Sequence, residues 1–240
     1  MYNFYKKGFT LAEVLITLAI IGVIATLTLP ALMTNIKEQQ AITAFKKAVN
    51  TLVTADEMNT AKQGWGYDGI KDNNTTELYD ENGNTYPSMY AILKENTNLV
   101  KYGKTRDYFK SVPAPAFFIK IDGKSSGGGS SMTNIAFFRD GTALLLMGYN
   151  TEISSGRAGF AGVIDVNGVK GPNMLSNCNG ENTSRISRIA YNDDINSNDY
   201  INPDNCNDKS KRVIKDRFPI VFTFKGILPG SDAAAWALSQ

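Results

Sequence analysis

The chain has 240 residues, a length that suits one domain with an appendage or two small domains. Its formal net charge of +2 provides no whole-chain electrostatic argument for nucleic-acid binding, and the absence of histidine excludes Ser-His-Asp and Cys-His catalysis and zinc sites that use imidazole. The two cysteines, Cys178 and Cys206, are too few for a structural zinc site but enough for one disulfide.

The first predicted element is an apolar segment from Phe9 to Ile36, in which Glu13 is the only charged residue. The segment exceeds the roughly 20 residues that a membrane-spanning helix needs. Lys6 and Lys7 precede it, and this asymmetry of lysines predicts a cytoplasmic N-terminus with the bulk of the chain across the membrane. A cleaved secretory signal would have a shorter apolar run, and a plain signal anchor would leave Glu13 unexplained, because a carboxylate in the bilayer costs about 2.5–3.5 kcal/mol.

Residues 6–30, KKGFTLAEVLITLAIIGVIATLTLP, resemble the N-terminus of type IV prepilins and type II secretion pseudopilins. In that family a prepilin peptidase removes a short basic leader after a glycine, the new N-terminal residue is methylated, and a glutamate four positions later guides assembly. The resemblance implies a cut between Gly8 and Phe9, N-methylation of Phe9 and an assembly role for Glu13. It also places Gly22 and Pro30 at the family's flexible glycine and kinking proline.

The cut would give Glu13 a partner of opposite charge. Cleavage after Gly8 creates a free amine at Phe9, and neither this amine nor the Glu13 carboxylate is stable alone in lipid, whereas a pair costs less. If the amine of an incoming subunit meets Glu13 of an assembled one, their burial favours the correct register. The alternative is a glutamate that snorkels to the membrane interface.

Apolar residues at three- and four-residue steps from Ile42 to Val53 predict that the helix continues with one apolar face, until Gly64-Trp65-Gly66 ends it. The predicted organisation is therefore a leader over 1–8, a long helix over 9–62 that spans the membrane at about 9–33, and a soluble head over 63–240.

The head is predicted to be a small antiparallel sheet. Ser88 is a candidate N-cap for a short helix within 88–100. Asp140-Gly141 is a hairpin signal. Five short apolar or alternating runs predict strands, at 115–122, 134–140, 142–149, 159–166 and 219–225. Such a sheet, packed against the long helix, gives an α+β, pilin-like fold.

The segment DVNGVKGPN, residues 165–173, combines tight turns with the oxygen donors Asp165, Asn167 and Asn173. Asp and Asn in turns commonly bond to the backbone, which is the favoured interpretation. Calcium also takes such oxygens, and some pseudopilins hold calcium in a head loop, although the spacing is not that of an EF-hand. Calcium is the one cofactor that the sequence leaves open.

Cys178 and Cys206 bracket a segment rich in Asn, Asp and Ser, and they resemble the disulfide-bounded C-terminal loop of many pilins. An exported head meets an oxidising environment, so we expect the two to pair, with free buried thiols as the alternative. The basic run 209–217 has no interleaved aromatic residues and contains Asp216, so it favours a solvated edge or a subunit contact over nucleic-acid binding.

No carboxylate pair, activated nucleophile or metal cluster in the sequence indicates an enzyme. The resemblance implies a structural subunit of a type IV pilus or type II secretion pseudopilus. Its partners would be like subunits, a prepilin peptidase and methyltransferase, an inner-membrane assembly platform and membrane lipid. The expected location is the bacterial inner membrane with a periplasmic head, then a filament. The competing interpretation is a single-pass, membrane-anchored surface binding or adhesion protein that does not polymerise.

Overall fold

A computed structural model describes residues 8–72, 75–104, 132–147, 160–168, 170–171, 173–178, 201–223 and 226–240. The chain divides between Gln40 and Ala41 into two compact units. The second unit, the head, therefore includes the last part of the long helix. The strand predicted at 115–122 lies outside the described residues.

Helix α1, Leu11–Gln63, confirms the long helix predicted over 9–62. In the head unit its apolar positions Ile42, Phe45, Val49 and Leu52 are buried, because a spacing of three and four residues places them on one helix face. The helix ends as predicted at Gly64, which has φ +78° and donates its N–H to Thr60 O at 2.9 Å. This left-handed termination suits glycine, which lacks a Cβ.

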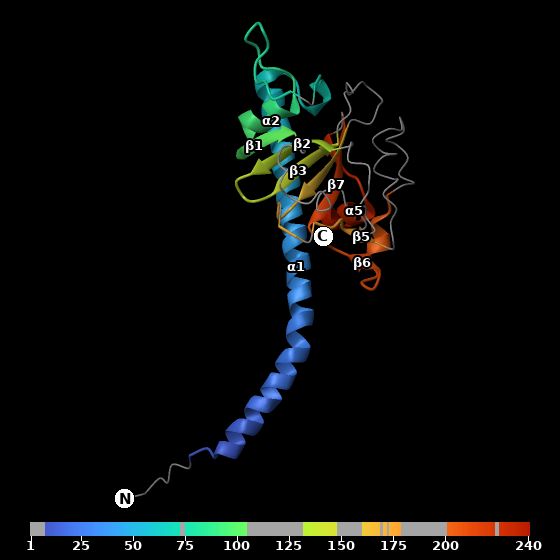
Figure 1. Ribbon diagram of the computed structural model, residues 1–240. Helices are drawn as coiled ribbons and strands as arrows, with labels where there is room; N and C mark the ends of the chain where they lie inside the picture. Colours follow the sequence, from blue (N-terminus) through green and yellow to red (C-terminus); the bar gives the residue numbers. More distant parts are fainter. Residues whose placement is uncertain are drawn as a thin grey trace, which may run out of the picture. The chain divides into compact units, whose positions relative to one another are not determined.

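The head contains a six-stranded antiparallel sheet in the order β1-β2-β3-β4-β7-β8, whose first strands stand side by side in Figure 1. Its strands are β1 Leu99–Lys104, β2 Met132–Phe138, β3 Ala143–Met147, β4 Phe160–Asp165, β7 Arg217–Thr223 and β8 Gly226–Pro229. Strands β2, β3, β4 and β7 confirm the predictions at 134–140, 142–149, 159–166 and 219–225. A second sheet pairs β5, Asn177–Cys178, with β6, Arg212–Val213.

The turn between β2 and β3 confirms the hairpin predicted at Asp140-Gly141. Gly141 adopts φ +90° and donates its N–H to Phe138 O at 3.0 Å. Asp140 Oδ1 accepts the Thr142 N–H at 3.1 Å and the Thr142 hydroxyl at 2.8 Å. The aspartate side chain therefore fixes the turn from within.

Among the described residues of the head, two short helices accompany the sheets. In α2, Met89–Asn96, the predicted cap Ser88 accepts the Ala91 N–H at 3.1 Å. Helix α5, Asp232–Ser239, was not predicted, and its cap Ser231 accepts the Ala234 N–H at 3.1 Å. Single 3-10 turns lie at η1, Tyr67–Gly69, and η4, Pro203–Cys206.

Apolar side chains are buried on both faces of the central strands of the sheet. On one face the Phe45 ring of α1 stacks on Phe218 of β7, with centroids 4.3 Å apart, and Tyr67 meets Phe222 edge-on at 4.8 Å. On the other face lies a second apolar cluster of Ile135, Ala143, Leu145, Val163 and Leu175. The head portion of α1 packed on an antiparallel sheet confirms the α+β, pilin-like architecture.

Candidate functional site

The start of α1 is closed by a reciprocal contact between Thr10 and Glu13. Thr10 donates its backbone N–H to Glu13 Oε2 at 2.8 Å and its hydroxyl to the same oxygen at 2.9 Å. The Glu13 N–H donates in return to Thr10 Oγ1 at 3.3 Å. This is a capping box, which satisfies N–H groups that the first turn of a helix otherwise leaves without partners. The Thr-x-x-Glu spacing at residues 10–13 is the local signal for this contact, which was not among the roles predicted for Glu13.

The capping box gives the Glu13 carboxylate partners within its own chain. Its negative charge lies at the N-terminal end of a helix, where the backbone dipoles favour an anion. The carboxylate is therefore stabilised within its own chain. Gly8 and Phe9 precede the helix, and Phe9 is 88 % exposed, so the bond at which cleavage was predicted lies in a non-helical, accessible segment.

The apolar half of α1 carries large side chains that the chain itself does not cover. Six of them are 58–74 % exposed: Leu15, Ile16, Leu18, Ile21, Val23 and Leu27. By length and composition the helix can cross a membrane. Exposed apolar surface of this extent indicates contact with lipid or with other apolar helices.

The hydroxyls in this apolar half are satisfied internally. Each donates to a backbone carbonyl three or four residues earlier, at 2.9–3.0 Å: Thr17, Thr26, Thr28 and Thr34. Such bonds let threonine lie in an apolar environment without an unpaired polar group. The threonines are therefore compatible with a membrane location.

Helix α1 continues through both Gly22 and Pro30. A Cβ placed on Gly22 would meet nothing within 4 Å, so packing within this chain does not require a glycine there. Pro30 lacks the N–H that would bond to the preceding turn, which weakens the helix locally. The predicted flexibility role of both residues stays a prediction.

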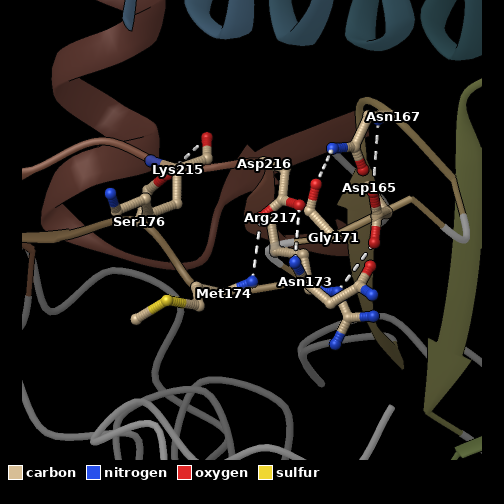
Figure 2. Close-up of polar contacts among 9 residues, drawn as sticks. All are labelled: Asp165, Asn167, Gly171, Asn173, Met174, Ser176, Lys215, Asp216 and Arg217. Carbon is tan, nitrogen blue, oxygen red and sulfur yellow. Dashed lines mark hydrogen bonds and ion pairs between the residues drawn. The ribbon is translucent and has the colours of Figure 1, made fainter. Parts of the chain in front are cut away.

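In the head, the turn at 165–173 is organised around a buried ion pair, shown in Figure 2. Arg217 Nε donates to Asp165 Oδ2 at 2.7 Å, and the two residues are 3 % and 0 % exposed. They face each other in register on β7 and β4. Burial raises the pKa of the Asp165 carboxyl to about 6, although the Arg217 charge acts in the opposite direction. Asp165 Oδ1 also accepts the Asn167 N–H at 3.2 Å.

A second carboxylate, Asp216, holds the other end of this turn (Figure 2). Its two oxygens accept the N–H groups of Asn173 at 2.7 Å and Met174 at 2.8 Å. Asn173 adopts φ +53°, and the Asn167 amide donates to Gly171 O at 3.2 Å. Asp216 was missing from the predicted set because it lies 43 residues after Asn173 in the sequence.

This geometry favours the turn over a calcium site. The Arg217 guanidinium already neutralises Asp165, so a dication at this carboxylate would meet a neighbouring positive charge. Within the described residues, no group of three or more Cys, Asp or Glu side chains is placed to hold a metal ion. The calcium site at Asp165, Asn167 and Asn173 stays a prediction that chelation can test.

The structure confirms the disulfide between Cys178 and Cys206, whose Cα atoms are 5.1 Å apart. The bond connects β5 to η4. Arg212 donates to Cys206 O at 3.0 Å, and its guanidinium lies 4.0 Å from the centre of the Trp236 ring in α5. The disulfide, β6 and α5 therefore form one packed region.

The Asp232 carboxylate of α5 strengthens this region, because it accepts the Asn202 N–H and the Asn205 amide, both at 2.7 Å. Two of the five cations in the basic run 209–217 are used inside the head: Arg217 in the ion pair and Arg212 against Trp236. Lys211 lies 3.6 Å from Asp208. The two arginines of the run therefore belong to the interior of the head, while the Lys211–Asp208 pair is exposed.

Comparison with known protein families identifies the N-terminal segment. Residues 3–29 match the prokaryotic N-terminal methylation motif, the cleavage and methylation signal of type IV pilins and pseudopilins. The resemblance drawn from residues 6–30 is thus confirmed: the chain carries a prepilin-type N-terminus on a pilin-like α+β fold. No match is found among curated proteins or among solved structures.

Proposed function

We propose that this chain is a structural subunit of a filament of the type IV pilus and type II secretion pseudopilus class, and that it polymerises through the apolar half of α1. One observation carries the proposal: the methylation motif at residues 3–29 opens directly into a helix whose apolar side chains the chain does not cover. The motif marks the chain for cleavage and methylation, and the exposed apolar side chains need other apolar surface to cover them. Both features suit a protein whose helix is buried among the helices of other copies after processing.

Processing would occur at the Gly8–Phe9 bond. A peptidase needs an extended, reachable backbone, and both residues lie before the first helical turn. Gly8 has open space around it, since a Cβ there would meet nothing within 4 Å. Cleavage leaves the Phe9 amine one residue from the capping box, and N-methylation of that amine would complete the mature N-terminus.

Assembly would exchange one partner of Glu13 for another. In the free chain the carboxylate accepts hydrogen bonds from Thr10. In a filament the Phe9 amine of the next subunit would approach it, and two opposite charges that leave water together are far less costly than either alone. Since the pair forms only at one stagger of neighbouring helices, it would select the register.

The proposed processing and assembly steps each require further protein partners. A prepilin peptidase and methyltransferase would act on the segment at the cytoplasmic face of the bacterial inner membrane, with the head on the periplasmic side. An inner-membrane assembly platform would then extract the subunit from the lipid. Gly22 and Pro30 would let the apolar half bend during that step, because each weakens the helix locally.

Mass spectrometry of the protein extracted from membranes of cells that contain a prepilin peptidase tests the processing step. The expected N-terminus is a methylated Phe9, and Gly8→Val should leave the leader attached without disturbing α1. An intact Met1, or a cut beyond Ala25, would contradict the proposal. A processed protein that stays monomeric in sheared and membrane fractions would favour the anchored binding protein instead.

A further inference from the structure

A short hairpin, residues 78–86, projects from the head at the top of Figure 1. Its two arms are joined by an antiparallel bridge between Tyr79 and Thr85. Asp80 fixes the tip, because its Oδ1 accepts the Asn84 N–H at 2.8 Å and its own N–H donates to Asn84 O at 2.8 Å. The hairpin is therefore held in one conformation by its own hydrogen bonds.

The hairpin and the residue before it carry only negative charge. Residues 77–86 contain the carboxylates of Glu77, Asp80 and Glu81 and no lysine or arginine. The Asp80 side chain is used in the tip, whereas Glu77 and Glu81 are exposed and have no side-chain partner within the described residues. Tyr79, which is 57 % exposed, lies between them in the sequence. A partner would therefore meet two available carboxylates and an aromatic ring.

A turn of opposite charge, residues 208–211, lies at the other end of the head, at the bottom of Figure 1. Asp208 holds this turn: its carbonyl accepts the Lys211 N–H at 3.1 Å, and its Oδ1 accepts the Ser210 hydroxyl at 2.7 Å. Lys209 and Lys211 are both exposed. Lys211 lies 3.6 Å from the Asp208 carboxylate, and in the part of the chain that the structure describes Lys209 has no side-chain partner. This lysine turn is therefore also pre-formed.

The acidic hairpin and the lysine turn complement each other. Residues 77–86 contain three carboxylates and no cation, whereas residues 208–215 contain four cations and one carboxylate. Because both segments are already ordered, little conformational freedom would be lost if they met. A contact between unlike surfaces at opposite ends of one subunit is heterologous, and its repetition produces an open chain of copies. The partner that this arrangement fits is a second copy of the same chain.

We propose that the acidic hairpin of one copy contacts the lysine turn of the next copy in the filament. Glu77 and Glu81 would face the two lysines, and the Tyr79 ring would lie against their methylene groups. This contact rests on the proposed polymerisation and adds an interaction between heads to the one between apolar helices. Exposed ion pairs are individually weak, so the contact would orient the heads, and like charges placed there would oppose assembly.

Charge reversal at each end tests the contact in cells that process and assemble the protein. Glu77→Lys/Glu81→Lys makes both ends basic, and Lys209→Glu/Lys211→Glu makes both ends acidic. Each variant alone should give about tenfold fewer sheared filaments than the unchanged protein, because like charges would meet. Co-expression of the two variants should restore the yield, with the two proteins alternating. Normal filaments from either variant alone, or no recovery in the mixture, would overturn the proposal.

The matched control is Glu57→Lys/Glu95→Lys, which makes the same change of charge at exposed positions outside the hairpin. It should assemble like the unchanged protein. A loss as large as that of the hairpin variant would assign the effect to net charge and overturn the proposal.

Disulfide trapping decides the question even if a charge-reversal variant does not fold. One copy carries Asn82→Cys at the hairpin tip and the other carries Ser210→Cys in the lysine turn. A disulfide between the two proteins is expected in mixed filaments, and its absence would contradict the contact. If the unchanged protein is processed but forms no filaments, the proposed function itself fails. Filaments whose yield ignores these charges would contradict only the contact between heads.

Discussion

Glu13 accepts two hydrogen bonds from Thr10, at 2.8 and 2.9 Å, so the carboxylate expected to pair between subunits already has a partner in its own chain. We propose two successive roles for this glutamate. It first closes the N-terminal turn of α1, and in the proposed filament it then receives the amine of a neighbouring Phe9. Thr10 consequently influences both the start of the helix and the position of the carboxylate.

Thr10→Val should loosen the first turn of α1 without abolishing cleavage. The valine lacks the hydroxyl that bonds to Glu13, and loss of an N-cap costs about 1 kcal/mol, which corresponds to roughly fivefold faster opening. Amide hydrogen exchange of residues 11–15 in detergent micelles measures this effect. Thr10→Ser retains the hydroxyl and should exchange like the unchanged protein; equal exchange in all three proteins would contradict the capping box.

The buried pair of Asp165 and Arg217 predicts a pH-dependent contribution to head stability. The folded-state pKa of Asp165, about 6, lies above the value of about 4 for an unfolded chain, so the folded head binds this proton more tightly. The contribution to stability is therefore fully present below about pH 4 and is lost as the pH rises through 6.

Urea unfolding of the protein and of Asp165→Asn across pH 4 to 7 measures this contribution, because asparagine cannot titrate. The free energy of unfolding of the unchanged protein, relative to the variant, should fall by on the order of 2–3 kcal/mol over that range. A difference that stays constant with pH, or rises, would show that Asp165 does not titrate in this way.

Loss of the Cys178–Cys206 disulfide should destabilise the head by about 3–4 kcal/mol, because the bond restricts the unfolded chain over a separation of 28 residues. The measurement is urea unfolding of the double variant Cys178→Ser/Cys206→Ser. The unchanged protein under reducing conditions provides the control and should lose a similar amount. Unfolding at the same urea concentration with and without the disulfide would disagree with this expectation.

Chelation separates the two interpretations of the turn at 165–173. Because Arg217 neutralises Asp165, we expect the melting temperature of the head to be the same with EDTA and with added calcium. A melting temperature that rises with calcium and falls with EDTA would restore the calcium site. In that case Asn173→Ala should remove the response, whereas Asn205→Ala, outside the turn, should not.

Local patterns in the sequence predict much of this fold. The spacing of Ile42, Phe45, Val49 and Leu52 indicates the helix face that is buried, and Asp140-Gly141 indicates the turn that joins β2 to β3. Both signals depend only on residues close in the chain. Two of the strands that were not predicted have weaker local patterns: β8 has four residues including Pro229, and β1 contains Gly103 and two lysines.

The interior of the head depends on contacts that no local pattern reveals. The Asp165–Arg217 pair joins residues 52 apart, and Lys47 reaches Asp140 across 93 residues. In the sequence Arg217 appears as one more cation of a basic run, while in the structure it is a buried partner of a carboxylate. Only the pairing of β4 with β7 brings these side chains together.

The central claim is that the cut after Gly8 supplies an amine that pairs with Glu13 of another subunit. Carbodiimide joins an amine to a carboxylate only when they are in contact, so we would treat filaments assembled from a mixture of the unchanged protein and a mass-marked variant, Leu15→Met. After trypsin digestion, mass spectrometry should find Phe9 of one protein linked to Glu13 of the other. A Glu13→Val variant should still be cleaved after Gly8, but it should contribute only its Phe9 amine to such links. Uncut leaders, or links confined to peptides from a single copy, would contradict the account.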